Sequence, residues 1–300
     1  MGIIDALLEG GTPKVQKKKR VTLYVIAVTA TLLALTLAFL LVAGTITAII
    51  SIPPKEPEDP VAVIKNLKSA ELEESLIHEG YLLLFDDEHP YIGNNKTVLM
   101  RDIDRPQTVG GTNAYTIGGM TTLGGTTEAI NAFNKMIEAF YKSSKDDNIY
   151  VSNAHNKDLG SKQDGVYVSG AAFELKYFSA AEDEDWSKKD YIYGVPKYNW
   201  IYNNAYRYGF ISVTPGSSVF RYVGVVHSTA MKNQRLDLES YLESLRSTSP
   251  DSPLTVNISG TVYGVYFLDK NGEHKLPTTQ EYTISGNNTD GYIVTVKTTK

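Results

Sequence analysis

The sequence contains no cysteine and only five histidines in 300 residues. The absence of cysteine excludes a disulfide framework and any zinc site built on thiolates, so a metal would need His, Asp or Glu ligands. Basic residues are also scarce beyond position 20, because the first twenty residues hold five of the 29 basic and two of the 34 acidic residues. The rest therefore carries 24 basic against 32 acidic residues, which argues against a nucleic-acid partner, since phosphate binding depends on a basic surface.

Charge is missing altogether between Val21 and Pro54, and most of that stretch is apolar. It exceeds the about 20 apolar residues that cross a bilayer as a helix. We therefore expect one transmembrane helix over residues 21–51. A cleaved signal peptide is the alternative, although its apolar region normally runs only about 7 to 15 residues. Basic residues precede the stretch and acidic ones follow it, so we expect a single-pass protein of the cell membrane with its N-terminus in the cytoplasm and its main domain outside.

The rest of the chain divides by composition. Residues 52–74 begin with a proline-rich, charged stretch that is typical of a semi-extended linker. From residue 251 the chain is rich in Thr, Val, Tyr and Gly, with alternating segments and a Lys-Asn-Gly turn at 270–272, which predicts a small antiparallel β extension. The predicted organisation is a basic tail over 1–20, the transmembrane helix over 21–51, a linker over 52–74, a main domain over 75–250 and the β extension over 251–300.

Helical and strand patterns mix within the main domain and its approach. Helices are expected over residues 65–79, 126–143, 198–208 and 236–245. Buried strands are expected over residues 81–86, 149–153, 166–178, 210–215 and 218–226. A few helices packed on a mixed sheet give the α+β class.

Three motifs in this order carry a family resemblance. They are W-x-x-x-N-A-x-x-Y-G-F at Trp200–Phe210, R-Y-V-G at Arg221–Gly224 and L-x-L-E-x-Y-L at Leu236–Leu242. Together they resemble the D-alanyl-D-alanine carboxypeptidases of the vancomycin-resistance type, which are zinc metallopeptidases of the bacterial cell wall. The resemblance covers roughly residues 75–246, and it implies a hydrolase fold with a groove for the peptidoglycan stem peptide.

The first zinc motif of that family, H-x-x-G-x-A-x-D, is altered in this chain. Aligning it on Gly170 and Ala172 places Tyr167 at the position of the histidine ligand and Glu174 at the position of the aspartate ligand. Of these two positions, only Glu174 keeps a side chain of the ligand's chemical type.

The second motif, E-x-W-H followed by an aromatic residue and R-Y-V-G, is altered as well. The alignment places Val219 at the third zinc ligand, Ser218 at the tryptophan and Gly216 at the glutamate that acts as general base. The family arginine that binds the terminal carboxylate of the substrate falls at His155 or Asn156. Neither side chain can form the bidentate pair of an arginine.

A catalytic zinc ion needs about three protein ligands and an open position for water, and Glu174 alone cannot hold it. We therefore expect a pseudopeptidase without zinc that binds a cell-wall stem peptide or an envelope protein. One alternative is an active zinc carboxypeptidase with a site rebuilt from His155, Glu174 and His227, although each histidine also has a structural explanation. The other alternative is a structural envelope protein.

Two further features have an ordinary and a functional explanation. The acidic stretch at residues 182–186 is more often a solvated loop than a cation site. The chain also has 20 tyrosines, several of them near the expected groove: Tyr167, Tyr191, Tyr193, Tyr198, Tyr202, Tyr206 and Tyr208. Each one is expected to pack the sheet or helix, but as a group they offer aromatic faces and hydroxyls for sugar or peptide contact.

Overall fold

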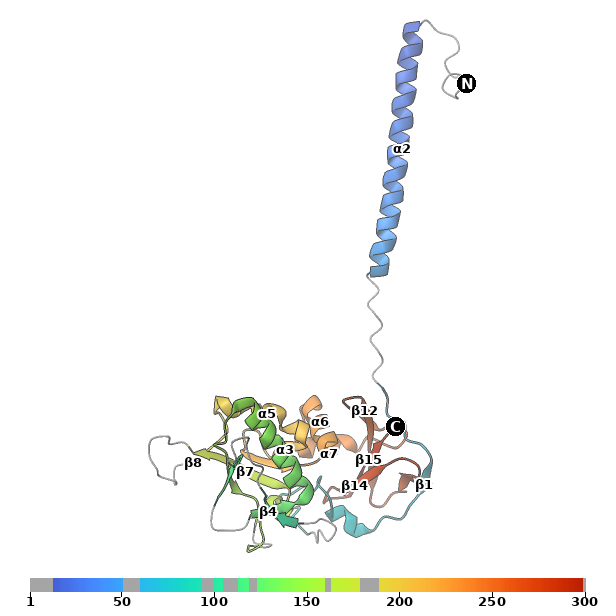
Figure 1. Cartoon of the computed structure of the whole chain (residues 1–300). Coiled ribbons are helices and arrows are strands. Elements are labelled where there is room, and N and C mark those ends of the chain that lie inside the picture. The colour runs from blue at the N-terminus through green and yellow to red at the C-terminus, as the bar shows by residue number, and fades with distance from the viewer. Residues whose placement is uncertain are drawn as a thin grey trace. The chain divides into compact units, whose positions relative to one another are not determined.

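The computed structural model describes residues 13–50, 60–92, 100–104, 113–118, 123–159, 163–178 and 189–298 (Figure 1). The chain divides into two compact units, residues 1–59 and residues 60–300.

The N-terminal unit contains one long helix, α2 (Pro13–Ile50). Within it, Arg20–Leu41 is long and apolar enough to cross a membrane, and none of that segment is buried by protein. Apolar side chains such as Leu33 and Phe39 are more than 70% exposed, which leaves them without a protein core to pack against. A helix of this kind near the N-terminus is either a membrane span or a signal sequence.

A mixed sheet lies at the centre of the second unit. Its strand order is β3 (Thr116–Ile117), β5 (Tyr150–Asn153), β7 (Ala172–Phe178), β10 (Val219–Tyr222) and β9 (Phe210–Ser212), with β8 (Lys189–Tyr191) also paired to β7. The β3–β5 pair is parallel and the other pairs are antiparallel. The α+β class with a mixed sheet is therefore confirmed.

Helix α3 (Thr127–Ser144) covers this sheet as its sequence pattern predicts. Thr126 caps it by accepting a hydrogen bond from the Ala129 amide. The apolar positions spaced along one face are all buried, and the Phe133 ring stacks on Phe173 of β7 with 4.5 Å between ring centroids. One apolar face and one capping residue thus fix both the position and the start of the helix.

Short strands and helical segments complete the part of the second unit that precedes residue 251. A three-stranded antiparallel sheet consists of β2 (Met100–Asp102), β4 (Leu123–Thr126) and β6 (His155–Asn156). The helical segments are η1 (Glu74–His78), α4 (Gly165–Val168), η3 (Pro196–Tyr198), α5 (Asn199–Asn204), η4 (Ala205–Tyr208), α6 (Val225–Gln234) and α7 (Leu238–Leu245). The helical prediction for residues 198–208 is confirmed as η3, α5 and η4, and the prediction for 236–245 as α7.

The C-terminal part is antiparallel, as predicted. Its sheet has the order β11 (Leu254–Ile258), β12 (Thr261–Asp269), β15 (Gly291–Lys297) and β14 (Tyr282–Gly286), while β13 (Lys275–Pro277) pairs with β1 (Leu67–Ser69). Val265 and Ile293 of this sheet share a buried cluster with Tyr241 and Leu245 of α7. The C-terminal sheet and the helices before it therefore have one core in common.

The sequence misplaced the elements before residue 90. The helix expected over residues 65–79 is wrong, because Leu67–Ser69 pairs with β13 and only Glu74–His78 is helical, as a 3₁₀ turn. The residues 60–74 that the sequence assigns to the linker lie in the second compact unit. Residues 52–59 of that linker lie outside the described part of the chain.

Two predicted strands also differ from the structure. Residues 81–86 form no strand although Leu82 and Leu83 are buried. Their backbone is instead bound by a side chain, because the Arg221 Nη2 atom donates to the carbonyls of Tyr81 and Leu83. The strand expected over residues 166–178 begins only at Ala172, after helix α4.

The strand expected over residues 218–226 ends at Tyr222, and its last two residues begin helix α6. Gly224 has a φ of +85°, which is a left-handed backbone conformation that favours glycine. The chain turns at Gly224, so the apolar run over residues 218–226 forms the end of a strand and then the start of a helix.

Candidate functional site

The two altered zinc motifs meet in the central sheet. Strands β7 and β10 pair in a register that places Val219 opposite Glu174. On the other side of β7, the backbone of Asn153 in β5 is also opposite Glu174. Glu174 thus lies on the central strand between Val219, which belongs to the second motif, and Asn153, which belongs to neither motif.

Tyr167 belongs to helix α4 and lies near Glu174. The Asp164 side chain caps this short helix by accepting a hydrogen bond from the Val166 amide, and Gly170, with a φ of +69°, turns the chain into β7. Burial raises the pKa of the Tyr167 phenol and the negative charge of Glu174 acts in the same direction, whereas the Asn153 side chain opposes both. The Tyr167 phenol therefore lies within electrostatic reach of Glu174 and near the Asn153 side chain.

Glu174 is held in place by a hydroxyl. The Ser152 Oγ atom donates to Glu174 Oε2 at 2.5 Å. Charge-assisted hydrogen bonds of this length are among the strong ones in proteins. Sequence reasoning missed both Ser152 and Asn153, because their contacts with the site arise from the pairing of β5 with β7 and not from a motif.

His155 belongs to strand β6 and lies beside Tyr167. Burial lowers the pKa of its imidazole. Its Nδ1 atom is buried and has no hydrogen-bond partner in the described part of the chain. Asn156, the other position aligned with the family arginine, is buried and its Oδ1 atom accepts from the Asp158 amide.

The Tyr193 ring lies beside Gly216, the residue that the sequence alignment places at the general base. Gly216 lies between β9 and β10 with a φ of +81°, and a Cβ atom added to it would lie 2.8 Å from the Tyr193 ring. Ser218 is buried beside the Tyr202 hydroxyl, which also donates to the Ser217 carbonyl at 3.2 Å. At these two positions the chain has packing contacts in place of a carboxylate and an indole.

The tyrosines near the site fall into different environments. Tyr198 is fully buried and its hydroxyl donates to the Asn148 carbonyl, so it belongs to the core. Tyr191 and Tyr193 are 54% and 61% exposed, whereas Ile192 between them is buried. Tyr191 ends strand β8, and Tyr193 lies in the turn that follows it.

His227 lies in a different part of the molecule. Its Nδ1 atom contacts the Tyr241 hydroxyl at 2.9 Å and its Nε2 atom contacts Thr295 Oγ1 at 3.0 Å. Both ring nitrogens are therefore occupied by neutral hydroxyl groups, and the structure does not bring His227 to Glu174. The acidic stretch at 182–186 lies outside the described residues.

The donors at the aligned positions do not fit a zinc ion. Within the described residues, no group of three or more His, Asp or Glu side chains is arranged to hold a metal. Val219 has no donor atom, Tyr167 offers a phenol whose pKa is raised, and one Glu174 oxygen already accepts from Ser152. A catalytic zinc site requires about three ligands together with an open position.

Comparison with known proteins gives relatives at the level of sequence and fold. No protein-family model matches the chain. A D-alanyl-D-alanine carboxypeptidase of Enterococcus faecium is 25% identical over 267 residues, which cover 81% of this chain and 84% of that protein. The solved structure of the vancomycin-resistance D,D-dipeptidase VanXYg with a D-Ala-D-Ala phosphinate analogue has a TM-score of 0.58 at 21% identity, covering 78% of this chain and 100% of that chain. The chain is thus similar in sequence to a D-alanyl-D-alanine carboxypeptidase and in fold to a vancomycin-resistance D,D-dipeptidase.

Proposed function

We propose that this protein is a membrane-anchored pseudopeptidase that binds a peptidoglycan stem peptide outside the cell without hydrolysing it. The observation that carries the proposal is the pairing of Val219 with Glu174, because it brings together the two motifs that carry zinc in the relatives. Tyr167, Glu174 and Val219 then supply one carboxylate where hydrolysis needs several ligands and a base.

The remaining groups suit peptide binding. Ser152 holds the Glu174 carboxylate in one orientation, and such a carboxylate accepts hydrogen bonds from peptide N–H groups or an ammonium. Tyr191 and Tyr193 add exposed aromatic faces next to this region, which provide contact area at a low cost in conformational entropy. The names of the relatives, a D-alanyl-D-alanine carboxypeptidase and a dipeptidase with a D-Ala-D-Ala analogue, support a peptide ending in D-alanine as the ligand.

The test uses the full-length protein in detergent and a stem pentapeptide that ends in D-Ala-D-Ala. We expect binding by titration calorimetry, no release of D-alanine and no stoichiometric zinc by elemental analysis. Tyr193→Ala should weaken binding about tenfold, which corresponds to about 1.4 kcal/mol. The matched control is Tyr141→Ala on helix α3. Absence of binding would contradict the proposal, and a stable complex with another envelope protein would then favour the structural alternative.

Restoring the metal site tests the assignment of the ligand positions. The combination of Tyr167→His, Glu174→Asp and Val219→His should bind zinc, whereas each change alone should not, because ligands act as a unit. Adding Gly216→Glu for hydrolysis requires Tyr193→Ala as well, since the Tyr193 ring fills the space beside Gly216. Elemental analysis and D-alanine release are the readouts. Zinc in the unaltered protein, with D-alanine release abolished by His155→Ala, would instead establish a relocated active site.

A further inference from the structure

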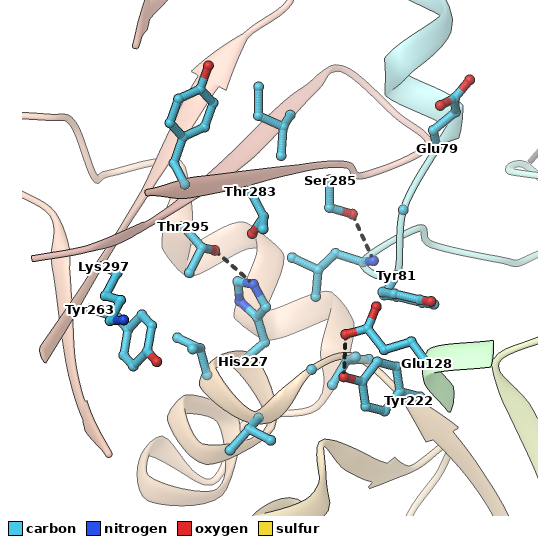
Figure 2. A pocket seen from close by; sticks show the side chains of 18 of the residues that line it. Glu79, Tyr81, Glu128, Tyr222, His227, Tyr263, Thr283, Ser285, Thr295 and Lys297 are labelled. Atoms are coloured by element: carbon cyan, nitrogen blue, oxygen red, sulfur yellow. Dashed lines mark hydrogen bonds between the residues drawn. The ribbon is translucent and has the colours of Figure 1, made fainter. Parts of the chain in front are cut away.

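A cavity separate from the candidate site lies between the C-terminal sheet and the start of helix α6 (Figure 2). Its volume is about 610 Å³, within the range of about 300 to 1,000 Å³ that is usual for small-molecule sites. None of Tyr167, Glu174, Gly216 and Val219 lines it. Its walls come from β14 and β15, the first residues of α6, residues 79–82 and Glu128 at the start of α3.

The walls of this cavity are fixed by hydrogen bonds. Figure 2 shows Thr295 bonded to His227 on one side and Glu128 bonded to Tyr222 on the other, with distances of 3.0 and 2.8 Å. The Leu82 amide donates to Ser285 Oγ at 3.0 Å and so joins the 79–82 segment to β14. Because these groups are already paired, the cavity is preformed, and a ligand would not have to order its walls.

The charged side chains of the cavity include two carboxylates whose surroundings the structure defines. Among the described residues of the lining, these are Glu128 and Glu281, and the lining also contains the cation Lys297. Lys297 lies 3.5 Å from Glu281 and offsets that carboxylate. His227 does not add a positive charge at neutral pH, because burial lowers its pKa to about 4.

Glu128 is the carboxylate best placed to meet a ligand. It is exposed to the cavity, and one of its oxygens accepts from Tyr222. No Lys or Arg of the described chain forms an ion pair with it. Burial raises the pKa of the neighbouring Tyr81 to about 12, and the Glu128 charge acts in the same direction. The lining of the same cavity also contains the apolar side chains of Leu82, Val225 and Val226.

We propose that this cavity binds a small organic amine, with its ammonium group on Glu128 and its apolar part against Leu82, Val225 and Val226. The ammonium supplies a positive charge opposite the Glu128 carboxylate, and it donates to the Glu128 oxygen positions that Tyr222 does not use. This site is separate from the stem-peptide site and does not depend on it.

The experiment compares two probes on the full-length protein in detergent by titration calorimetry. L-leucinamide carries an ammonium group on an aliphatic body, and N-acetyl-L-leucinamide carries the same body without the charge. Loss of the charge should weaken binding at least about tenfold, as expected for a charge-assisted contact. Glu128→Gln should weaken L-leucinamide binding by a similar factor, because the amide keeps the shape and removes the charge.

Two further variants make the result specific. Thr283→Phe on β14 should abolish L-leucinamide binding by filling the cavity. Glu239→Gln, which changes an exposed carboxylate of α7 outside both sites, should leave that binding unchanged. If Glu128→Gln loses its cooperative thermal transition, the two probes on the unaltered protein and Thr283→Phe decide the question. Equal binding of both probes, no binding of L-leucinamide, or a loss caused by Glu239→Gln and not by Thr283→Phe would overturn the proposal.

Discussion

Arg221 and His227 are buried basic side chains of the described part of the chain, and each one joins segments that are distant in sequence. Arg221 binds the carbonyls of Tyr81 and Leu83 and lies over the Phe85 ring at 4.6 Å. His227 joins helix α6 to α7 through Tyr241 and to β15 through Thr295. Arg221 belongs to the R-Y-V-G motif of the sequence, and these contacts give that arginine a structural role.

His227 gives a prediction for stability against pH. Its pKa falls from 6.5 to about 4 because burial disfavours the charged imidazole. Between these values the unfolded chain binds a proton that the folded protein does not, so the free energy of unfolding decreases as the pH falls from about 6.5 toward 4. From about pH 7 to about pH 5 the loss attributable to His227 is on the order of 2 kcal/mol.

Urea unfolding followed by tryptophan fluorescence at the two pH values measures this loss. His227→Gln should unfold with a smaller difference between the two pH values than the unaltered protein, because glutamine does not titrate there. His155, whose pKa is also lowered by burial, remains in both proteins and does not affect the comparison. An identical pH dependence in the two proteins would contradict the assignment.

At the scale of elements, the turn between β14 and β15 binds residues 78–90, which lie more than 190 positions earlier in the chain. Asn288 adopts a φ of +63°, a left-handed conformation that asparagine tolerates better than most residues. Its Nδ2 atom contacts the carbonyls of Leu84, His89 and Pro90, and its Oδ1 atom contacts His78. The C-terminal sheet therefore supports the irregular segment over residues 77–90.

Asn288→Ala should reduce the free energy of unfolding by about 2 to 3 kcal/mol, because several backbone carbonyls lose their donor and alanine disfavours a positive φ. Urea unfolding measures the change. The matched control is Asn271→Ala, in an exposed turn of the same sheet, which should change stability by no more than about 0.5 kcal/mol. Equal effects of the two substitutions would show that the Asn288 contacts do not stabilise the fold.

At the scale of the whole molecule, the apolar segment of α2 leads to a prediction of membrane topology. Basic residues precede it in the sequence and acidic ones follow, so we expect residues 52–300 outside the membrane on the extracytoplasmic side. Protease added to intact cells should release the outer part, while a cytoplasmic marker stays intact. Protection of the outer part until the cells are lysed would show the opposite orientation, and its release into the medium without protease would indicate a cleaved signal peptide.

The local patterns of the sequence were sufficient for helix α3, for α7 and for the alternating strands after residue 251. Each of these elements presents an apolar face with the period of its own backbone, and a cap or turn residue marks its end. The motif alignment also identified Tyr167, Glu174 and Val219 as residues of one candidate site. These features depend on residues close together in the chain or on a resemblance carried by short motifs.

The tertiary structure alone decided the form of residues 60–90 and the contacts of the site. The Leu67–Ser69 strand depends on β13, more than 200 residues later, and the Tyr81 and Leu83 carbonyls depend on Arg221, about 140 residues later. Ser152 meets Glu174 only because β5 pairs with β7. A local apolar pattern shows that a segment is buried, but the backbone conformation it adopts depends on which distant groups satisfy its hydrogen bonds.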